Sequence, residues 1–245
     1  AATIDNPVEL PTLTKTEYAV DWTSSLEPRF VLGRYYRSDT AIVRRFSQGD
    51  PAYRQDPLST HWALAFTDEF YTGIHKNPDD PDDSASYMRF VSASGKTIFF
   101  KRATGLAPLN PEYGYVAAVE GSYFNGTTKP FTVTDPQGVV YRFTYRGGAP
   151  SGQHYGANRH YLSSVTWRDG FKISFERTFM AEGTRITAIS DNRGQRITFT
   201  YSTDTLNNGG VVPSEWQRVV GATIYGPGAT GSQTLIGHVA YDYAD

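Results

Sequence analysis

A repeated spacing around four glycines constrains the fold of this chain more than any other feature of its sequence. The anchor residues are Gly95, Gly138, Gly170 and Gly194. A phenylalanine stands five residues after each anchor, at Phe100, Phe143, Phe175 and Phe199, and this fixed position in the repeat predicts that the four side chains lie in the core. Apolar or aromatic residues also stand three residues after each anchor and five residues before it, whereas the positions between them are mostly polar. A period of two is typical of half-buried strands, so each unit predicts two β-strands joined by a turn that contains the glycine.

The residues of the turns support this hairpin interpretation. Glycine is favoured where the backbone needs a positive φ, because a Cβ atom would clash there. Asp135 and Asp191 stand three residues before their glycines, where a carboxylate can accept hydrogen bonds from the turn backbone. A fifth hairpin is predicted from residues 219–224 and 236–243, joined by a longer glycine-rich turn.

Helical patterns are short in this sequence. The best candidates are residues 214–221 and 83–88, each two turns at most. Aromatic residues make up 14% of the 245 residues, and 23 residues are glycine, which favours β structure over helix. We therefore predict an all-β chain of successive antiparallel hairpins in one large curled sheet, with few short helices.

Composition and charge exclude several classes of function. The chain has no cysteine, so it has no disulfide, no thiolate nucleophile and no cysteine-ligated zinc or iron–sulfur site. Its formal net charge of −2 argues against a sequence-independent nucleic-acid binder, whose binding face would be strongly basic. No run of 18 apolar residues occurs, so the sequence predicts no membrane span. We therefore expect neither nucleic acid nor a membrane as a partner.

Two of the repeat units share a longer motif, D-x-x-G-x-x-x-x-F-x-Y. It comprises Asp135, Gly138, Phe143 and Tyr145 in one unit and Asp191, Gly194, Phe199 and Tyr201 in the other. This motif resembles the YD-repeat, or RHS-repeat, family of bacterial and teneurin-like proteins, and the final YDY of residues 241–243 looks like the start of another unit. Residues 5–22, 29–38 and 59–70 are similar to the segment that opens RHS proteins, although His61 stands where that family has glycine.

The resemblance implies a β-shell in which hairpins add edge to edge around a C-terminal toxin or other effector. On this interpretation residues 1–75 form the opening segment and residues 76–245 the hairpin repeats. The chain would be a non-enzymatic part of the shell of a secreted or cell-surface bacterial protein, without cofactor or metal. Its partners would be the remainder of the shell or the enclosed cargo. A shell fragment leaves a sheet edge unpaired at residues 236–243, so we also expect the chain either to self-associate through this edge or to cover it.

Other candidate sites carry weaker signals. His154 and His160 could bind a metal, but their spacing matches no recognised ligand pattern. The acidic run at 79–84 lacks the glycine and distal glutamate of an EF-hand loop. No local motif pairs any two of the carboxylates Glu112, Glu120, Glu176 and Glu182 as a glycoside hydrolase needs. A carbohydrate- or surface-binding module remains the alternative function, and a hydrolase the third. The binding module would use aromatic residues outside the repeat, namely Tyr35, Tyr36, Tyr113, Tyr115, Trp167 and Trp216.

Overall fold

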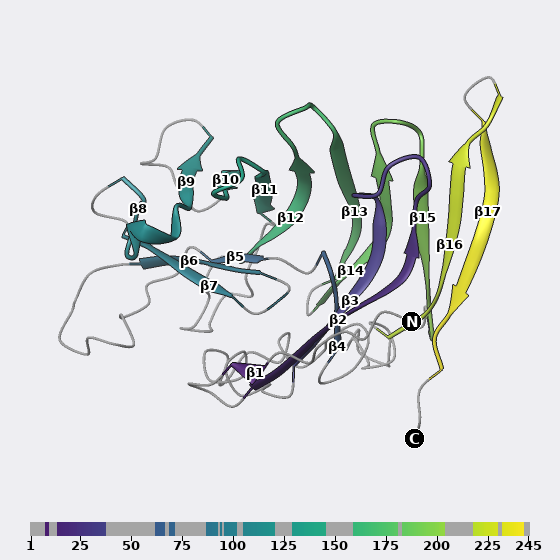
Figure 1. Cartoon of the computed structure of the whole chain (residues 1–245), viewed down its shortest axis with the longest axis horizontal. Helices are drawn as coiled ribbons and strands as arrows, with labels where there is room; N and C mark the ends of the chain where they lie inside the picture. The colour runs from purple at the N-terminus through teal and green to yellow at the C-terminus, as the bar shows by residue number, and fades with distance from the viewer. Residues whose placement is uncertain are drawn as a thin grey trace. The chain divides into compact units, whose positions relative to one another are not determined.

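The chain is nearly all β, as predicted. The computed structural model describes residues 8–9, 14–37, 62–66, 69–71, 87–92, 94, 96–101, 105–120, 129–145, 159–180, 183–203, 218–229 and 232–242. These residues form the strands β1–β17 and one short 3₁₀ helix, η3 (Pro111–Tyr113). Figure 1 shows the strands along the chain, with β1 in purple and β17 in yellow.

The chain divides into two compact units. Unit 1 comprises Ala1–Ala65, Ala93–Gly95 and Glu176–Asp245. Its N-terminal sheet has the order β1-β2-β3-β4, and four further strands follow the order β17-β16-β15-β14. The N-terminal strands are β1 (Val8–Glu9), β2 (Thr14–Thr23), β3 (Val31–Arg37) and β4 (Trp62–Leu64). The later strands are β14 (Gly183–Asp191), β15 (Arg196–Tyr201), β16 (Val219–Pro227) and β17 (Gln233–Ala240).

Unit 2 comprises Phe66–Ser92 and Lys96–Phe175. One path of paired strands runs β12-β5-β6-β7-β8, and β12 also pairs with β11, which continues through β10 to β9. The strands are β5 (Glu69–Tyr71), β6 (Tyr87–Val91), β7 (Thr97–Lys101), β8 (Ala107–Pro108), β9 (Val116–Val119), β10 (Phe131–Thr134), β11 (Val140–Tyr145) and β12 (Arg159–Thr166). Strand β13 (Lys172–Met180) pairs with β12 and ends in unit 1. The strands pair antiparallel throughout these paths.

Each predicted repeat unit is a hairpin, which we name by its anchor glycine. In all four, the residue five positions before the glycine lies directly opposite the residue three positions after it. These cross-strand pairs are Phe90–Ile98, Val133–Tyr141, Val165–Ile173 and Ile189–Ile197. All of these side chains are buried except Tyr141, which is half-buried. The repeated spacing therefore encodes a cross-strand contact, which is the unit of stabilisation in a sheet.

The phenylalanines five positions after the anchors lie mostly in the core. Phe100 and Phe143 are fully buried and Phe175 is 9% exposed, but Phe199 is only half-buried. Polar and charged residues occupy most of the alternating positions, as the period of two requires. Tyr201 also lies half-buried, with the Arg185 guanidinium 4.5 Å from its ring centroid. The side chain of Tyr145 lies outside the described residues, although its backbone ends β11.

The anchor glycines adopt the backbone conformation that favours glycine. Gly138, Gly170 and Gly194 have φ angles of 79°, 82° and 91°, in the left-handed region. The backbone N–H of Gly138 donates to the carbonyl of Asp135 at 2.9 Å, which closes a tight turn. Gly95 lies outside the described residues.

The predicted aspartate caps are present. The Oδ1 atoms of Asp135 and Asp191 each accept hydrogen bonds from the backbone N–H groups two and four residues further on, at 2.8 to 3.0 Å. The Gly95 hairpin uses Ser92 at the equivalent position, where its Oγ accepts from the N–H of Lys96 at 2.9 Å. In the Gly170 hairpin Asp169 supplies the acceptor, 3.2 Å from the N–H of Phe171. A short polar side chain thus satisfies the turn backbone in every hairpin.

Both helix predictions are wrong where the structure describes them. Residues 219–221 of the first candidate belong to β16, and residues 87–88 of the second belong to β6. Strand β16 pairs with β15 on one edge and with β17 on the other. Its buried residues include Val219, Gly221, Ala222 and Ile224, with half-buried residues between most of them. Pairing with neighbouring strands therefore overrides the weak local helical pattern. The remaining residues of both candidates, 214–217 and 83–86, lie outside the described part of the chain.

The fifth hairpin forms, but with different bounds from those predicted. Strand β16 extends to Pro227, and β17 begins at Gln233 and ends at Ala240. A register shift between Ile224 and Tyr225 lets the pairing continue as far as Pro227 opposite Gln233. The connecting turn is consequently shorter than the glycine-rich sequence suggested.

Candidate functional site

The Gly194 turn carries a buried polar network. Asp191 and Gln195 are buried, and the Nε2 of Gln195 donates to Asp191 Oδ2 at 2.6 Å. The other end of the same amide, Oε1, accepts a hydrogen bond from the hydroxyl of Ser24. This contact joins residues 171 positions apart in the sequence. Because a buried amide is costly without partners, the network requires the segment around Ser24 to be in place.

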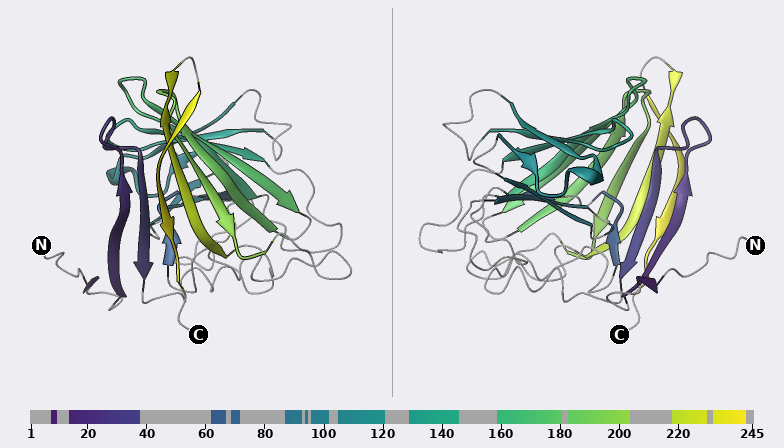
Figure 2. Two further views of the ribbon diagram at one scale, coloured as in Figure 1. Left: turned by 90° about the vertical axis from the view of Figure 1, so that its right-hand side faces the viewer. Right: turned by 60° about the vertical axis from the view of Figure 1, so that its left-hand side comes forward.

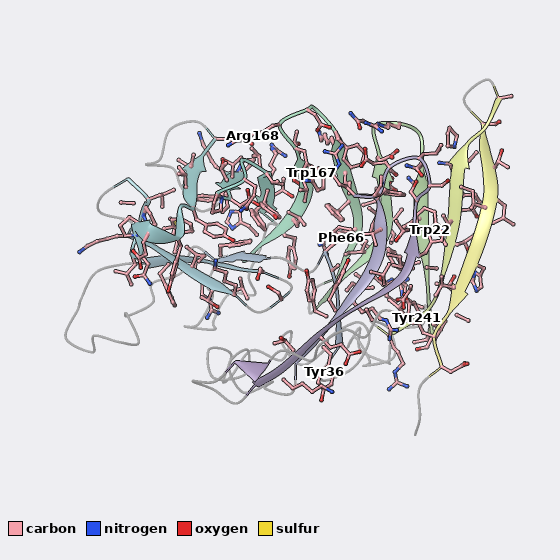
Figure 3. The ribbon with its side chains drawn as sticks, in the orientation of Figure 1. Trp22, Tyr36, Phe66, Trp167, Arg168 and Tyr241 are labelled. Carbon is pink, nitrogen blue, oxygen red and sulfur yellow. The ribbon has the colours of Figure 1, made fainter. Side chains whose placement is uncertain are left out.

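Residues 24–30, which join β2 to β3, form a compact loop. We call this segment the Ser24–Phe30 loop. The N–H of Ser24 donates to the carbonyl of Phe30 at 3.0 Å, and Ser24 Oγ accepts from the N–H groups of Leu26 and Glu27 at 3.0 and 3.1 Å. Phe30 is fully buried, and its ring contacts Trp22 edge to face at a centroid distance of 6.1 Å. Trp22 is labelled in Figure 3. The loop therefore has a defined shape that its own hydrogen bonds maintain.

Glu27 links this loop to the Gly194 turn. Its side chain is 6% exposed, and its carboxylate accepts from Arg29 Nε at 2.7 Å and Nη2 at 2.8 Å. Arg193 Nη1 lies 3.0 Å from Glu27 Oε2. The hydrogen bonds from Arg29 lower the pKa of Glu27 below its usual value, the charge of Arg193 acts in the same direction, and burial opposes both. The ionised form of Glu27 is thus the form that the folded chain favours.

The lowered pKa of Glu27 predicts a specific loss of stability in acid. A carboxylate whose pKa is lower in the folded state contributes stability above its unfolded-state pKa, and this contribution is lost as the pH falls through the folded value. We expect the Glu27→Gln variant to be less stable than the wild type at pH 7, and the difference to shrink below roughly pH 4. Urea unfolding between pH 3 and 7 measures this. Parallel pH profiles of the two proteins would contradict it.

A second contact fixes the end of the last hairpin to the N-terminal sheet. The hydroxyl of Tyr241 donates to Asp21 Oδ2 at 2.8 Å, and Arg34 Nη2 lies 2.9 Å from Asp21 Oδ1. The Arg34 guanidinium also lies 5.6 Å from the centre of the ring of Tyr241, a residue labelled in Figure 3. Both views of Figure 2 show the N-terminal strands β2 and β3 beside β16 and β17 of the same unit. Residues that follow the last hairpin and residues near the start of the chain thus meet in unit 1.

Sequence analysis did not predict these contacts. The S-x-x-E spacing of Ser24 and Glu27 is a recognisable turn signal, and it could have indicated the shape of the loop. Nothing local to Gln195 or Tyr241 indicates a partner 171 or 220 residues away.

Strand β17 is the terminal strand of its path. It pairs with β16, and among the described residues no strand pairs with its other edge. Leu235 and Ile236 are 63% and 51% exposed, and residues 233–240 contain no lysine, arginine, aspartate or glutamate. Natural edge strands usually carry charges or proline that prevent further pairing. Within the described part of the chain, the outer edge of β17 thus has no paired strand and carries none of these charges.

Two of the four candidate catalytic carboxylates are engaged by arginines. Arg142 donates to Glu120 through Nε at 2.6 Å and Nη2 at 2.8 Å, and Arg196 Nη2 donates to Glu176 at 2.7 Å. These hydrogen bonds lower the pKa of both glutamates. A general acid needs a raised pKa instead, so neither glutamate has the environment of a catalytic acid. Glu112 lies in the exposed η3 turn, and Glu182 lies outside the described residues.

Of the two candidate metal-binding histidines, the structure describes His160. His160 lies on β12 rather than in a loop, is fully buried, and its Nε2 donates to the carbonyl of Lys129 at 3.0 Å. Its ring packs edge to face against Phe131. His154 and the acidic run at 79–84 lie outside the described residues, and within those residues no group of three or more metal-binding side chains occurs. The described part of the chain also contains no helix long and apolar enough to cross a membrane.

The candidate aromatic residues differ in exposure. Tyr113 is 44% exposed, while Tyr35, Tyr36, Tyr115 and Trp167 are partly buried. The Lys96 ammonium lies 5.2 Å from the centre of the Tyr113 ring and 4.7 Å from that of Tyr115. Tyr18 and Tyr35 pack against each other across β2 and β3. Trp216 lies outside the described residues.

Known structures share the fold of this chain, although sequence comparison finds no relative. No protein-family model matches it, and no curated protein matches it either. The Photorhabdus luminescens Tc holotoxin pore aligns with a TM-score of 0.53 at 10% identity, over 94% of this chain and 14% of that one. The TcdB2–TccC3–Cdc42 structure aligns at 0.52 and 10% identity, over 93% of this chain and 14% of that one. The chain thus spans a small part of these toxin chains.

A shorter protein matches over nearly its whole length. The N-terminal domain of the effector protein SpvB from Salmonella typhimurium strain LT2 aligns with a TM-score of 0.50 at 11% identity, over 89% of this chain and 97% of that one. Identities this low show similarity of fold alone. The fold of this chain is therefore one that toxin-related bacterial proteins also use.

Proposed function

We propose that this chain is a structural, non-enzymatic segment of an RHS- or YD-repeat β-shell. The shell would belong to a secreted or cell-surface bacterial protein, and it would enclose or present a C-terminal effector. Three findings support this proposal: the four hairpins repeat one cross-strand pair, two of their turns share the same aspartate cap, and the fold resembles that of toxin chains. Exclusion would be the mechanism, because a continuous hydrogen-bonded wall would separate the cargo from the cell that makes it.

The observation that carries the proposal is the edge of β17, which pairs with no other strand than β16 among the described residues. A repeat that adds hairpins side by side must present such an edge at its last strand, and β17 has no charged residue to block pairing. Its partner in a longer shell would be the next hairpin. The YDY sequence at 241–243 stands where that hairpin would begin.

For the chain in isolation, we expect a second copy to occupy this edge. Sedimentation analysis should detect concentration-dependent association of the wild type. The Leu235→Lys variant should weaken association roughly tenfold or more, because it removes an exposed apolar side chain and places a charge on the edge. Thr200→Lys is the matched control, since Thr200 is also exposed but lies on β15, which pairs on both sides.

Two results would count against the proposal. One is a wild-type chain that remains monomeric at all concentrations while the amides of β17 exchange freely. The other is saturable glycan binding that is lost in the Tyr113→Ala variant, because it would favour the alternative of a carbohydrate-binding module.

A further inference from the structure

Among the Gly138, Gly170 and Gly194 hairpins, the residue that follows the anchor glycine distinguishes one hairpin from the other two. In the Gly138, Gly170 and Gly194 hairpins this residue is buried, and it is Val139, Phe171 and Gln195 respectively. Two hairpins therefore place an apolar side chain at this position, whereas the Gly194 hairpin places an amide there at 1% exposure. A buried amide destabilises a fold unless its hydrogen bonds are made, so the Gln195 amide needs hydrogen-bond partners at this turn.

The partner of that amide is the Ser24–Phe30 loop. Gln195 Oε1 accepts from Ser24, and its Nε2 is held by Asp191, which fixes the orientation of the amide. The residue before the anchor also differs between turns. It is Arg193 in the Gly194 turn, where its guanidinium contacts Glu27, and Gln137 in the Gly138 turn. Both residues that set the Gly194 turn apart therefore contact the same loop.

The loop makes most of its polar contacts within itself. Ser24 Oγ accepts two backbone hydrogen bonds of its own loop, and most contacts of Glu27 come from Arg29 two residues away. The Ser24 hydroxyl hydrogen and a carboxylate oxygen of Glu27 make the contacts with the Gly194 turn. A preorganised loop with two directed polar groups has little ordering entropy to lose on docking.

We propose that Arg193 and Gln195 form a docking site that selects the Ser24–Phe30 loop and so places the N-terminal sheet on the Gly194 hairpin. The Gly138 and Gly170 hairpins share the positive φ of the anchor glycine but lack this pair of side chains, so they cannot receive the loop. Specificity of this kind comes from leaving polar groups unpaired in every wrong arrangement. The inference does not depend on whether the chain belongs to a shell.

The chain itself supplies a matched test. The double variant Arg193→Gln, Gln195→Val changes the turn from DNRGQ to DNQGV, close to the DPQGV of residues 135–139, which forms the same capped turn. We expect hydrogen exchange in residues 14–37 to rise about tenfold or more, while residues 196–201 and 219–227 keep their protection. Gln137→Arg is the control, since it alters the corresponding exposed position of another turn and should leave residues 14–37 unchanged.

Either of two other outcomes would overturn the proposal. Unchanged exchange in residues 14–37 would mean that the pair does not hold the loop. A uniform rise through all the described strands of unit 1 would mean that the pair supports the core rather than the docking. The single variant Arg193→Gln changes only an exposed turn residue, so it provides the same measurement if the double variant does not fold. When Arg193→Gln is combined with Glu27→Gln, the effects of the two changes on hydrogen exchange in residues 14–37 should be non-additive. Additive effects would contradict a direct contact between the two side chains.

Discussion

Replacing Phe143 by alanine is expected to lower the free energy of unfolding by about 3–5 kcal/mol. The Phe143 side chain is fully buried, lies opposite Phe131 across β10 and β11, and contacts the ring of Phe90 at a centroid distance of 5.9 Å. Truncation would remove this packing and leave a cavity that rigid strands cannot fill. Urea or thermal unfolding of the purified variant measures the loss.

Phe199 provides the comparison for this prediction. It occupies the same repeat position but is only half-buried, so Phe199→Ala should cost about 1–2 kcal/mol less than Phe143→Ala. Equal losses at the two positions would show that burial does not determine the effect. In that case the interpretation of this repeat position as core would fail for Phe143.

The second large effect is expected at Asp191. Its carboxylate accepts from two backbone N–H groups of the turn and from the side-chain amide of Gln195. Asp191→Ala would leave these donors without an acceptor in a buried site, at a cost of about 2–4 kcal/mol. Chemical denaturation gives this value directly.

Asp135 is the matched position in the Gly138 turn. It makes the same two backbone contacts but is half-buried, so Asp135→Ala should cost only about 1 kcal/mol because water can reach the turn. A loss at Asp135 as large as that at Asp191 would contradict the role given to the buried amide. Asp191→Asn, which keeps one acceptor oxygen, should lie between the wild type and Asp191→Ala.

Much of the fold could be predicted from short stretches of sequence. The alternation around Gly138 and Gly194 predicted strands, and the positive φ of both glycines confirms the turns. The caps by Asp135 and Asp191 were also predicted correctly. All of these features depend on residues within a few positions of one another, and the physical rules for turns operate over that range.

Predictions failed where neighbouring strands decided the outcome. Residues 214–221 have a weak helical pattern, yet those from Val219 onward pair with β15 and β17 as a strand. The sequence also predicted Phe199 as core, but the side chain is only half-buried, because burial depends on what covers a strand as well as on its alternation.

The sequence by itself determined the hairpins, their turns and the side of each strand that faces inward, because period and turn chemistry are local properties. Only the tertiary structure decided that Ser24 meets Gln195 and that Asp21 meets Tyr241. Those contacts join residues 171 and 220 positions apart, and their formation depends on which turn the folded sheets bring against the Ser24–Phe30 loop. A polar side chain shows that it needs a partner, but its position in the sequence does not show where that partner lies.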